Sequence, residues 1–284
     1  MVACRWPRRQ PTDSPHDCYT VKCMERRHII AGFAASALTA ATVRPAENTT
    51  NTYLELKTWR LHNTAEDQAK RVADYLQHGL APALERAGGQ LAGAFANVIG
   101  PDGPYYITLT QYASLAAMQD TFTKMKSDHA HEDALQKLSA GPGLPFVRVE
   151  SSLLHSFDVM PQIDMGGSGE ASSSRIFELR TYESQNFLTL ARKVGMFNHG
   201  EAQIFQRLGM RPVFFGETLV GSRQPNLTYM LSYDSLAARD KLWGAFGSDP
   251  EWKKLSKQPG LSDPEIVANI SNVILRSLPF SPIR

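Results

Sequence analysis

Hydrophobic and polar residues follow two different periods in the second half of the chain. Over residues 175–183 they alternate, which is the pattern of a β-strand with one buried face. Over residues 186–208 the apolar residues recur every three or four positions, which predicts an amphipathic helix that ends at Gly209. The complete predicted order is a strand at 175–183, a helix at 186–208, strands at 212–220 and 227–233 that form a hairpin, a helix capped by Ser235 and a strand at 266–276.

The first half of the chain repeats this pattern. Residues 53–59 match residues 176–182, and beyond that strand the matching positions lie 121 apart. The exception follows a four-residue insertion in the first half, where Pro142-Gly143 matches Pro259-Gly260 before the register returns. One difference is Pro82, which lacks an N–H group and is expected to kink the long helix of the first copy. The sequence is therefore an internal duplication. Its clearest matches include the His-Gly pairs at 78–79 and 199–200 and the Ser-Leu-Ala-Ala segments at 114–117 and 235–238.

A segment rich in glycine and serine separates the two copies. This composition is typical of a flexible linker, which we assign to residues 162–174. The first domain then spans residues 50–161 and the second spans residues 175–284, with an N-terminal segment at 1–46 outside both. Each domain has a common domain size.

Both copies have the element order β-α-β-β-α-β, which is the ferredoxin-like motif. Helices cover one face of such a sheet and leave the other face uncovered. Because an uncovered face is usually hidden by a second sheet, we expect the two tandem ferredoxin-like domains to close into a dimeric α+β barrel. The predicted fold class is α+β.

Several segments of the second half are typical of a known family. They are residues 177–182, 199–200, 229–233 and 239–252. Together they resemble the NIPSNAP family, and the resemblance extends less closely over residues 53–160. It implies a dimeric α+β-barrel fold and an activity that is poorly defined in the family. The mitochondrial and partner-recruiting role of eukaryotic relatives is not carried over to this chain.

The first half departs from the family pattern at two places. Met118 stands where the second half has the basic residue Arg239. Residues 128–131 read Asp-His-Ala-His, where the second half has Asp-Pro-Glu-Trp.

The chain begins with a segment that has the order of an export signal. From Met24, the expected true start, a basic Arg26-Arg27 pair is followed by a short apolar stretch and by small residues. The stretch is shorter than the ~20 residues of a membrane span, and the arginine pair resembles a twin-arginine signal. We therefore expect a periplasmic or extracellular protein with no stable membrane span after processing. The alternatives are a disordered tail and an uncleaved anchor.

Removal of this segment changes the charge of the protein. The whole chain has 30 Lys and Arg residues against 28 Asp and Glu residues, a net charge of +2. Residues 1–46 hold seven of the basic and three of the acidic residues, so the remainder has a net charge of −2. That balance argues against a nucleic-acid partner. Cys4, Cys18 and Cys23 all precede Met24, which excludes thiolate chemistry from the processed protein.

Charged and aromatic residues occupy one face of the first strand of each copy. Glu55, Lys57 and Trp59 share a face, opposite Leu54 and Leu56. We expect the leucines to pack on the helices and the other three side chains to point into the barrel. Charges inside a barrel are costly unless they are paired, so each acid should neighbour a base.

The second copy repeats this arrangement with Glu178, Arg180 and Tyr182. Tyr112 and Tyr233 are further candidates to line the same space. Two interpretations stay open for these residues. They could line a small-molecule pocket with convergent polar groups, or they could form an ion-pair ladder that fixes how the two halves dock.

The remaining polar candidates are weaker. His78 and His199 lie about 200° around the helix from its apolar stripe, which favours exposed or interface positions over catalytic ones. Residues 128–133 have side chains that suit a divalent metal, but acids near a helix start explain them as well. No glycine-rich phosphate loop follows a strand, and no Gly-x-Ser-x-Gly motif is present. We predict no metal and no cofactor.

Three hypotheses of function follow. The first is a binding protein whose barrel holds a small, partly apolar molecule near the charged residues. The second is a cofactor-free oxygenase or isomerase, an idea that rests on fold analogy alone. The third is a structural or partner-docking module with a filled barrel. A homo-oligomer is expected in each case.

Overall fold

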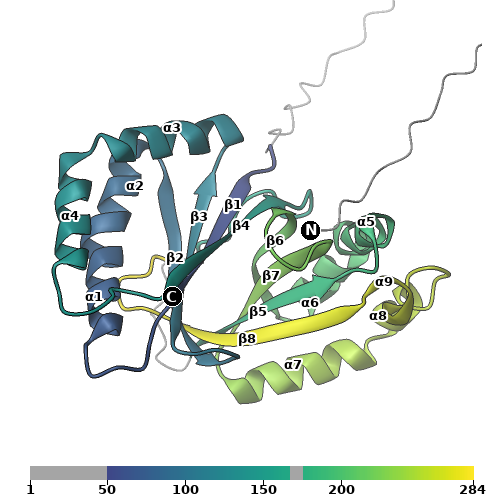
Figure 1. Cartoon of the computed structure of the whole chain (residues 1–284). Coiled ribbons are helices and arrows are strands. Elements are labelled where there is room, and N and C mark those ends of the chain that lie inside the picture. Colours follow the sequence, from purple (N-terminus) through teal and green to yellow (C-terminus); the bar gives the residue numbers. More distant parts are fainter. Residues whose placement is uncertain (1–49, 167–174) are drawn as a thin grey trace, which may run out of the picture. The chain divides into compact units, whose positions relative to one another are not determined.

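A computed structural model describes residues 50–166 and 175–284 (Figure 1). The N-terminal segment at 1–46, which the sequence predicts to be an export signal, and much of the predicted linker lie outside the described residues. The strands are β1 (Tyr53–Arg60), β2 (Gln90–Ile99), β3 (Tyr105–Tyr112), β4 (Arg148–Ser156), β5 (Ile176–Glu183), β6 (Arg211–Val220), β7 (Asn226–Tyr233) and β8 (Asn269–Ser277). The helices are α1 (Gln68–Tyr75), η1 (Leu76–Leu80), α2 (Ala81–Ala87), α3 (Leu115–Lys126), α4 (His129–Ser139), α5 (Phe187–Met196), η2 (Phe197–Glu201), α6 (Ala202–Arg207), α7 (Leu236–Ser248), α8 (Pro250–Leu255) and α9 (Asp263–Ile266).

The strands of the two halves form one closed antiparallel barrel. Within the first half the order is β4-β1-β3-β2, and within the second it is β8-β5-β7-β6, the ferredoxin-like order in both cases. The edge strands pair across the halves, β2 with β8 and β4 with β6, so that each half covers the open edges of the other. Helices α1–α4 lie beside the strands of the first half and α5–α9 beside those of the second (Figure 1). The predicted α+β barrel is confirmed.

Apolar side chains fill the interior of the barrel. All eight strands contribute to one buried cluster, which includes Leu54 of β1, Phe95 of β2, Phe177 of β5 and Phe214 of β6. The rings of Phe95 and Phe177, which come from opposite halves, have centroids 5.0 Å apart. An eight-stranded barrel is just wide enough for its own side chains to fill it. The interior is therefore a packed core.

This packing reverses the orientation predicted for the first strands. Leu54 and Leu56 face the barrel interior, whereas the side chains of Glu55, Lys57 and Trp59 lie on the opposite face, beneath the helices. The same reversal holds in β5, and for Tyr112 of β3 and Tyr233 of β7. The physical reason is that the barrel interior is sealed by both halves, whereas the space under the helices supplies polar partners for charged groups.

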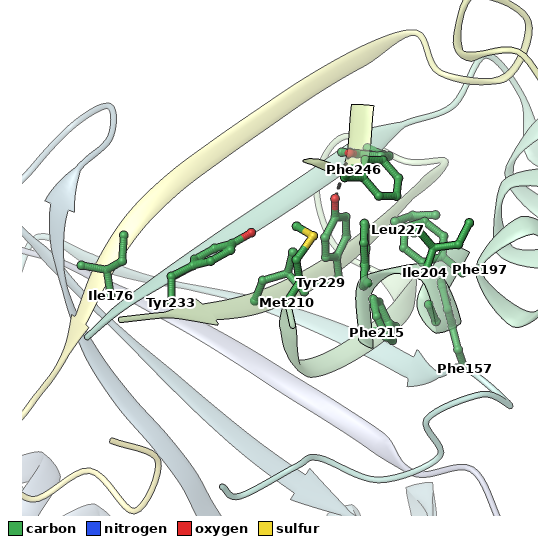
Figure 2. Close-up of a cluster of buried hydrophobic side chains, with 14 of the residues drawn as sticks. Phe157, Ile176, Phe197, Ile204, Met210, Phe215, Leu227, Tyr229, Tyr233 and Phe246 are labelled. Atoms are coloured by element: carbon green, nitrogen blue, oxygen red, sulfur yellow. Dashed lines mark hydrogen bonds between the residues drawn. The ribbon is translucent and has the colours of Figure 1, made fainter. Parts of the chain in front are cut away.

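Each half has a second core between its sheet and its helices. In the second half this core is rich in aromatic rings, among them Phe197, Phe215, Tyr229 and Phe246 (Figure 2). Phe157, which follows β4 of the first half, packs into it as well. The corresponding core of the first half includes Trp59 and Tyr75 together with smaller side chains.

The long helix of each half contains one π-helical turn, η1 or η2, at its His-Gly pair. The turn occurs in both copies, so Pro82, which the second copy lacks, does not cause it. A Cβ atom on Gly79 would lie 2.8 Å from Cβ of Ala134 in α4. The glycine therefore permits close approach of the neighbouring helix, and the side chains of His78 and His199 stay exposed.

Over residues 50–166 and 175–284, no helix combines the length and the apolar character needed to cross a membrane.

Candidate functional site

The residues selected from the sequence form two clusters, one beneath the helices of each half. Glu55, Lys57 and Tyr112 meet in the first half. Glu178, Arg180, Tyr182 and Tyr233 meet in the second. Since the two sets lie in different cores, they do not converge on a single shared site.

In the second half the fully buried carboxylate of Glu178 is the centre of a hydrogen-bonded network. It accepts hydrogen bonds from Arg180 at 2.9 Å, Arg239 at 2.5 Å and the indole N–H of Trp243 at 2.9 Å. Asn272 and Tyr233 donate to it as well, at 3.0 and 3.4 Å. Burial alone would raise the pKa of Glu178, but the Arg239 hydrogen bond and the Arg180 charge lower it to about 2. Glu178 is therefore a fixed anion.

Aromatic rings close the space around this network. The guanidinium of Arg180 lies 4.4 Å from the ring centroid of Trp243, and it donates to the Tyr182 hydroxyl at 3.2 Å. The hydroxyl of Tyr229 donates to the same oxygen at 2.8 Å. Trp252 packs on Phe246 with centroids 4.5 Å apart. These contacts fill the space around Glu178 with side chains, which is typical of a structural network.

The first half has a smaller polar network. The carboxylate of Glu55 binds the Lys57 amine at 3.0 Å and accepts hydrogen bonds from Tyr112 at 3.2 Å and Ser151 at 2.9 Å. Burial and then the Glu55 charge raise the pKa of the Tyr112 hydroxyl. The Lys57 amine also lies 5.1 Å from the ring centroid of Phe122 in α3. The side chain of Lys57 is 26% exposed, against 12% for its counterpart Arg180 in the second half.

A cavity of about 610 Å³ opens beside Lys57, between the sheet and the helices of the first half. Strands β1 and β4 form its floor, and its walls come from α1, η1, α3 and α4. Its volume is within the range of small-molecule sites. The lining residues are Lys57, Trp59, Tyr75, Leu80, Phe122, Met125, Lys126, His131, Glu132, Leu135 and Val149.

Matched positions of the duplication explain why the second half is filled here. Phe122 corresponds to Trp243 and His131 to Trp252, 121 positions later in each case. The packing confirms the first match, because Lys57 lies over Phe122 as Arg180 lies over Trp243. Two tryptophans thus occupy, in the second half, the positions of smaller side chains that line the cavity in the first.

A tyrosine–histidine pair forms part of the cavity wall. The Tyr75 hydroxyl lies 3.0 Å from Nε2 of His131, and Nδ1 of His131 lies 3.2 Å from the carbonyl oxygen of Met125. A carbonyl only accepts, so Nδ1 carries the proton and Nε2 accepts from Tyr75. Burial raises the pKa of Tyr75 to about 12.

The sequence did not predict this cavity, and it indicated His131 only as a weak candidate for a metal ligand. Among the described residues, no group of three His, Cys, Asp or Glu side chains is arranged to hold a metal ion. The signal that could have found the site was the departure between the copies, since 128–131 is a place where the duplication fails to repeat itself.

Fold and cavity together define a tandem α+β-barrel protein with an open pocket beneath the helices of its first half. The chain belongs to the NIPSNAP family, which it matches twice, over residues 54–154 and 177–282. The expected tandem arrangement is thereby confirmed. No curated protein matches the sequence.

Solved structures share the fold at low sequence identity. A candidate monooxygenase from Fusobacterium nucleatum is 12% identical over 81% of this chain and 93% of its own, with a TM-score of 0.53. Another from Lactobacillus acidophilus is 10% identical over 80% of this chain and 94% of its own, with a TM-score of 0.51. A NIPSNAP family protein from Agrobacterium tumefaciens is 24% identical over 39% of this chain and 99% of its own, with a TM-score of 0.34. For the two candidate monooxygenases, identities this low show the fold alone.

Proposed function

We propose that this protein binds a small, partly apolar molecule in the cavity beneath the helices of its first half. The observation that carries the proposal is the contrast within one chain. The same fold occurs twice. The cavity is open in the first copy, whereas in the second copy Trp243 and Trp252 pack at the corresponding positions. The filled copy indicates that the fold does not need the cavity, which supports a role of the cavity in ligand binding.

The walls of the cavity suit such a ligand. Trp59, Phe122 and Val149 offer flat or branched apolar surface, and Lys57 and His131 bring polar groups to the same space. Binding sites for small molecules combine a mostly apolar lining with a few convergent polar groups in this way. The barrel interior, where we first expected the ligand, is filled by apolar side chains.

The test is to fill the cavity with the residues of the second copy. The double variant F122W/H131W places tryptophans where the fold already accepts them. Anilinonaphthalene sulfonate, an aromatic anion, serves as a fluorescent probe of binding. We expect one probe molecule per wild-type chain and at least about a tenfold loss of affinity in the double variant, because the space is occupied.

The matched control is W243F/W252H, which makes the reciprocal change in the second half. The control should retain the first-half site, and circular dichroism should report the same fold in all three proteins. Equal probe binding by the wild type and F122W/H131W would remove the cavity from the proposal. Native mass spectrometry of protein purified from its source then tests for a retained natural ligand.

We further propose that residues 24–46 direct export of the protein. The support is the order of the sequence, an arginine pair followed by an apolar stretch and small residues. N-terminal sequencing of the protein from its source should begin near residues 38–47. An intact Met24 would contradict cleavage.

A further inference from the structure

We propose that Tyr75 and His131 accept a proton from a hydroxyl group of the bound molecule, so that the pocket takes phenols or enols and holds them as anions. This inference rests on the proposed binding function and names the class of ligand. It concerns the polar part of the pocket, where a hydrogen-bonded pair and a cation face the same cavity.

The hydrogen bonds fix the direction in which a proton can move. Nδ1 of His131 donates to the Met125 carbonyl oxygen, so the lone pair of Nε2 is directed at the Tyr75 hydroxyl, 3.0 Å away. The two rings are stacked, with an interplanar angle of 28°. The hydroxyl oxygen of Tyr75 keeps free lone pairs, which can accept a hydrogen bond from a ligand.

The surroundings hold Tyr75 in its protonated form until a partner acts on it. Its side chain is 7% exposed and packs edge-on to Trp59, with ring centroids 5.8 Å apart. Because burial disfavours the charged form of Tyr75, the residue can relay a proton only if it gains one from the ligand as it gives its own to His131.

The second copy supplies an internal comparison. The position of Tyr75 is occupied there by Met196, and that of His131 by Trp252. Both polar members of the pair are thus replaced by side chains without a proton acceptor in the half whose space is filled. Packing alone does not need the pair, since apolar side chains satisfy the same positions of the same fold. The Tyr75–His131 pair is therefore present in the half that has the open cavity and absent from the half that is filled.

Charged groups around the pair favour an anionic product. Lys57 on β1 and Lys126 on α3 face the cavity, against one carboxylate in its lining, Glu132 on α4. Two further carboxylates have partners of their own: Asp74 of α1 binds Lys70, and Asp128, which caps α4, binds Arg86. Glu55 of β1 binds Lys57 itself and offsets part of its charge, so Lys126 is the main positive group in the lining. A phenolate or enolate oxygen in the cavity would therefore find a nearby ammonium group, which stabilises the anion.

The step is a proton transfer with no change of oxidation state. The O–H bond of the ligand breaks and its proton bonds to the hydroxyl oxygen of Tyr75. The proton of Tyr75 passes at the same time to Nε2 of His131. The products are the ligand anion and an imidazolium whose Nδ1–H still donates to Met125, so no further reactant is required.

The experiment uses para-nitrophenol, whose anion absorbs visible light while the neutral phenol does not. The bound probe is titrated with acid and base at saturating protein, in the wild type and in Tyr75→Phe and His131→Phe. We expect the acid dissociation constant of the bound probe to be at least about tenfold larger in the wild type than in either variant, about one pKa unit. Lys57 is present in all three proteins, so its charge does not produce the difference.

Para-nitroanisole, which has the same shape but no hydroxyl proton, separates the possible failures. Its binding is followed by displacement of anilinonaphthalene sulfonate. If it binds and the bound para-nitrophenol has the same acid constant in all three proteins, the proton-accepting role is wrong and the binding function stands. If neither compound binds, the pocket itself is wrong. Tyr75→Phe removes one oxygen atom only, so its fold should be retained, and circular dichroism checks this.

Discussion

Glu178 shows how one residue can be essential to the fold without facing a ligand. Its carboxylate is fully buried, yet two arginines, an indole, an amide and a phenol bind it. The equivalent Glu55 has a lysine, a serine and a tyrosine. Glu178 thus has more hydrogen-bond partners than Glu55, and it lies in the half where tryptophans occupy the positions that line the cavity in the first half. Both observations indicate a structural role for Glu178.

Replacing Glu178 by Gln should therefore destabilise the protein. The change leaves Arg180 and Arg239 without their anion, a loss of about 3 kcal/mol in the free energy of unfolding at pH 7. Urea denaturation measures it. The control Glu183→Gln, on the same strand but with one exposed partner, Asn269, should change the free energy of unfolding by less than about 0.5 kcal/mol.

The same carboxylate predicts how stability depends on pH. The pKa of Glu178 is lowered in the folded protein from 4.5 to about 2. Its contribution to stability is thus complete above pH 4.5 and is lost as the pH falls toward 2. The difference between the wild type and Glu178→Gln should shrink over that interval in urea titrations. A difference that stays constant to pH 2 would contradict the assignment.

At the scale of elements, a buried ion pair joins α5 to η2 in the second half. The Lys193 amine lies 2.9 Å from the Glu201 carboxylate, and both side chains are almost fully buried. Burial opposes the charge of Lys193, but the charge of Glu201 keeps the pKa of the amine above its usual value. The first half has Val72 and Leu80 at the matching positions. The equivalent helices of the two copies are therefore packed at these positions by an ion pair in one case and by two apolar side chains in the other.

This comparison defines a double-mutant cycle. Lys193→Val leaves the buried Glu201 carboxylate without its partner, and Glu201→Leu leaves the Lys193 amine with only the more distant Asp263 carboxylate, at 3.6 Å. Each single variant should cost about 3–5 kcal/mol. The double variant K193V/E201L has the apolar residues of the first half at both positions, and its free energy of unfolding should be much closer to that of the wild type. Thermal and urea denaturation give the four free energies. Additive single effects would show that the pair is not coupled.

At the scale of the whole molecule, the barrel closes within one chain. Both seams, β2 with β8 and β4 with β6, join the two halves. The duplication therefore supplies the second sheet that each half needs, and barrel closure does not require another chain. The expected homo-oligomer stays a prediction.

Since the halves share the barrel core, we expect them to unfold together. Trp59 reports on the first half and Trp243 on the second, so variants in which one of these two is the single tryptophan left in the chain should show coincident urea transitions. Phe177→Ala, which opens a cavity in the shared core, should cost about 3–5 kcal/mol and lower both midpoints equally. Ile99→Ala, at an exposed position, serves as the control. Separate midpoints for the two halves would contradict a shared core.

The sequence by itself determined the duplication, the order of the elements and the α+β barrel, because these depend on periodicity and on matches along the chain. It also identified Glu55, Lys57, Glu178 and Arg180 as members of paired charge networks. The face they occupy was decided only by the tertiary structure. An alternating strand has two faces, and which one is the barrel interior depends on closure by the other half.

The open pocket is likewise a product of tertiary structure. Tyr75 and His131 lie on different helices, and nothing in the spacing of the two residues places them 3.0 Å apart. Whether a space is open depends on the summed volumes of side chains from β1, β4 and the helices, a quantity that no local pattern contains. The sequence contains one indication of the pocket, namely the two positions at which the second copy has tryptophan and the first has a smaller residue.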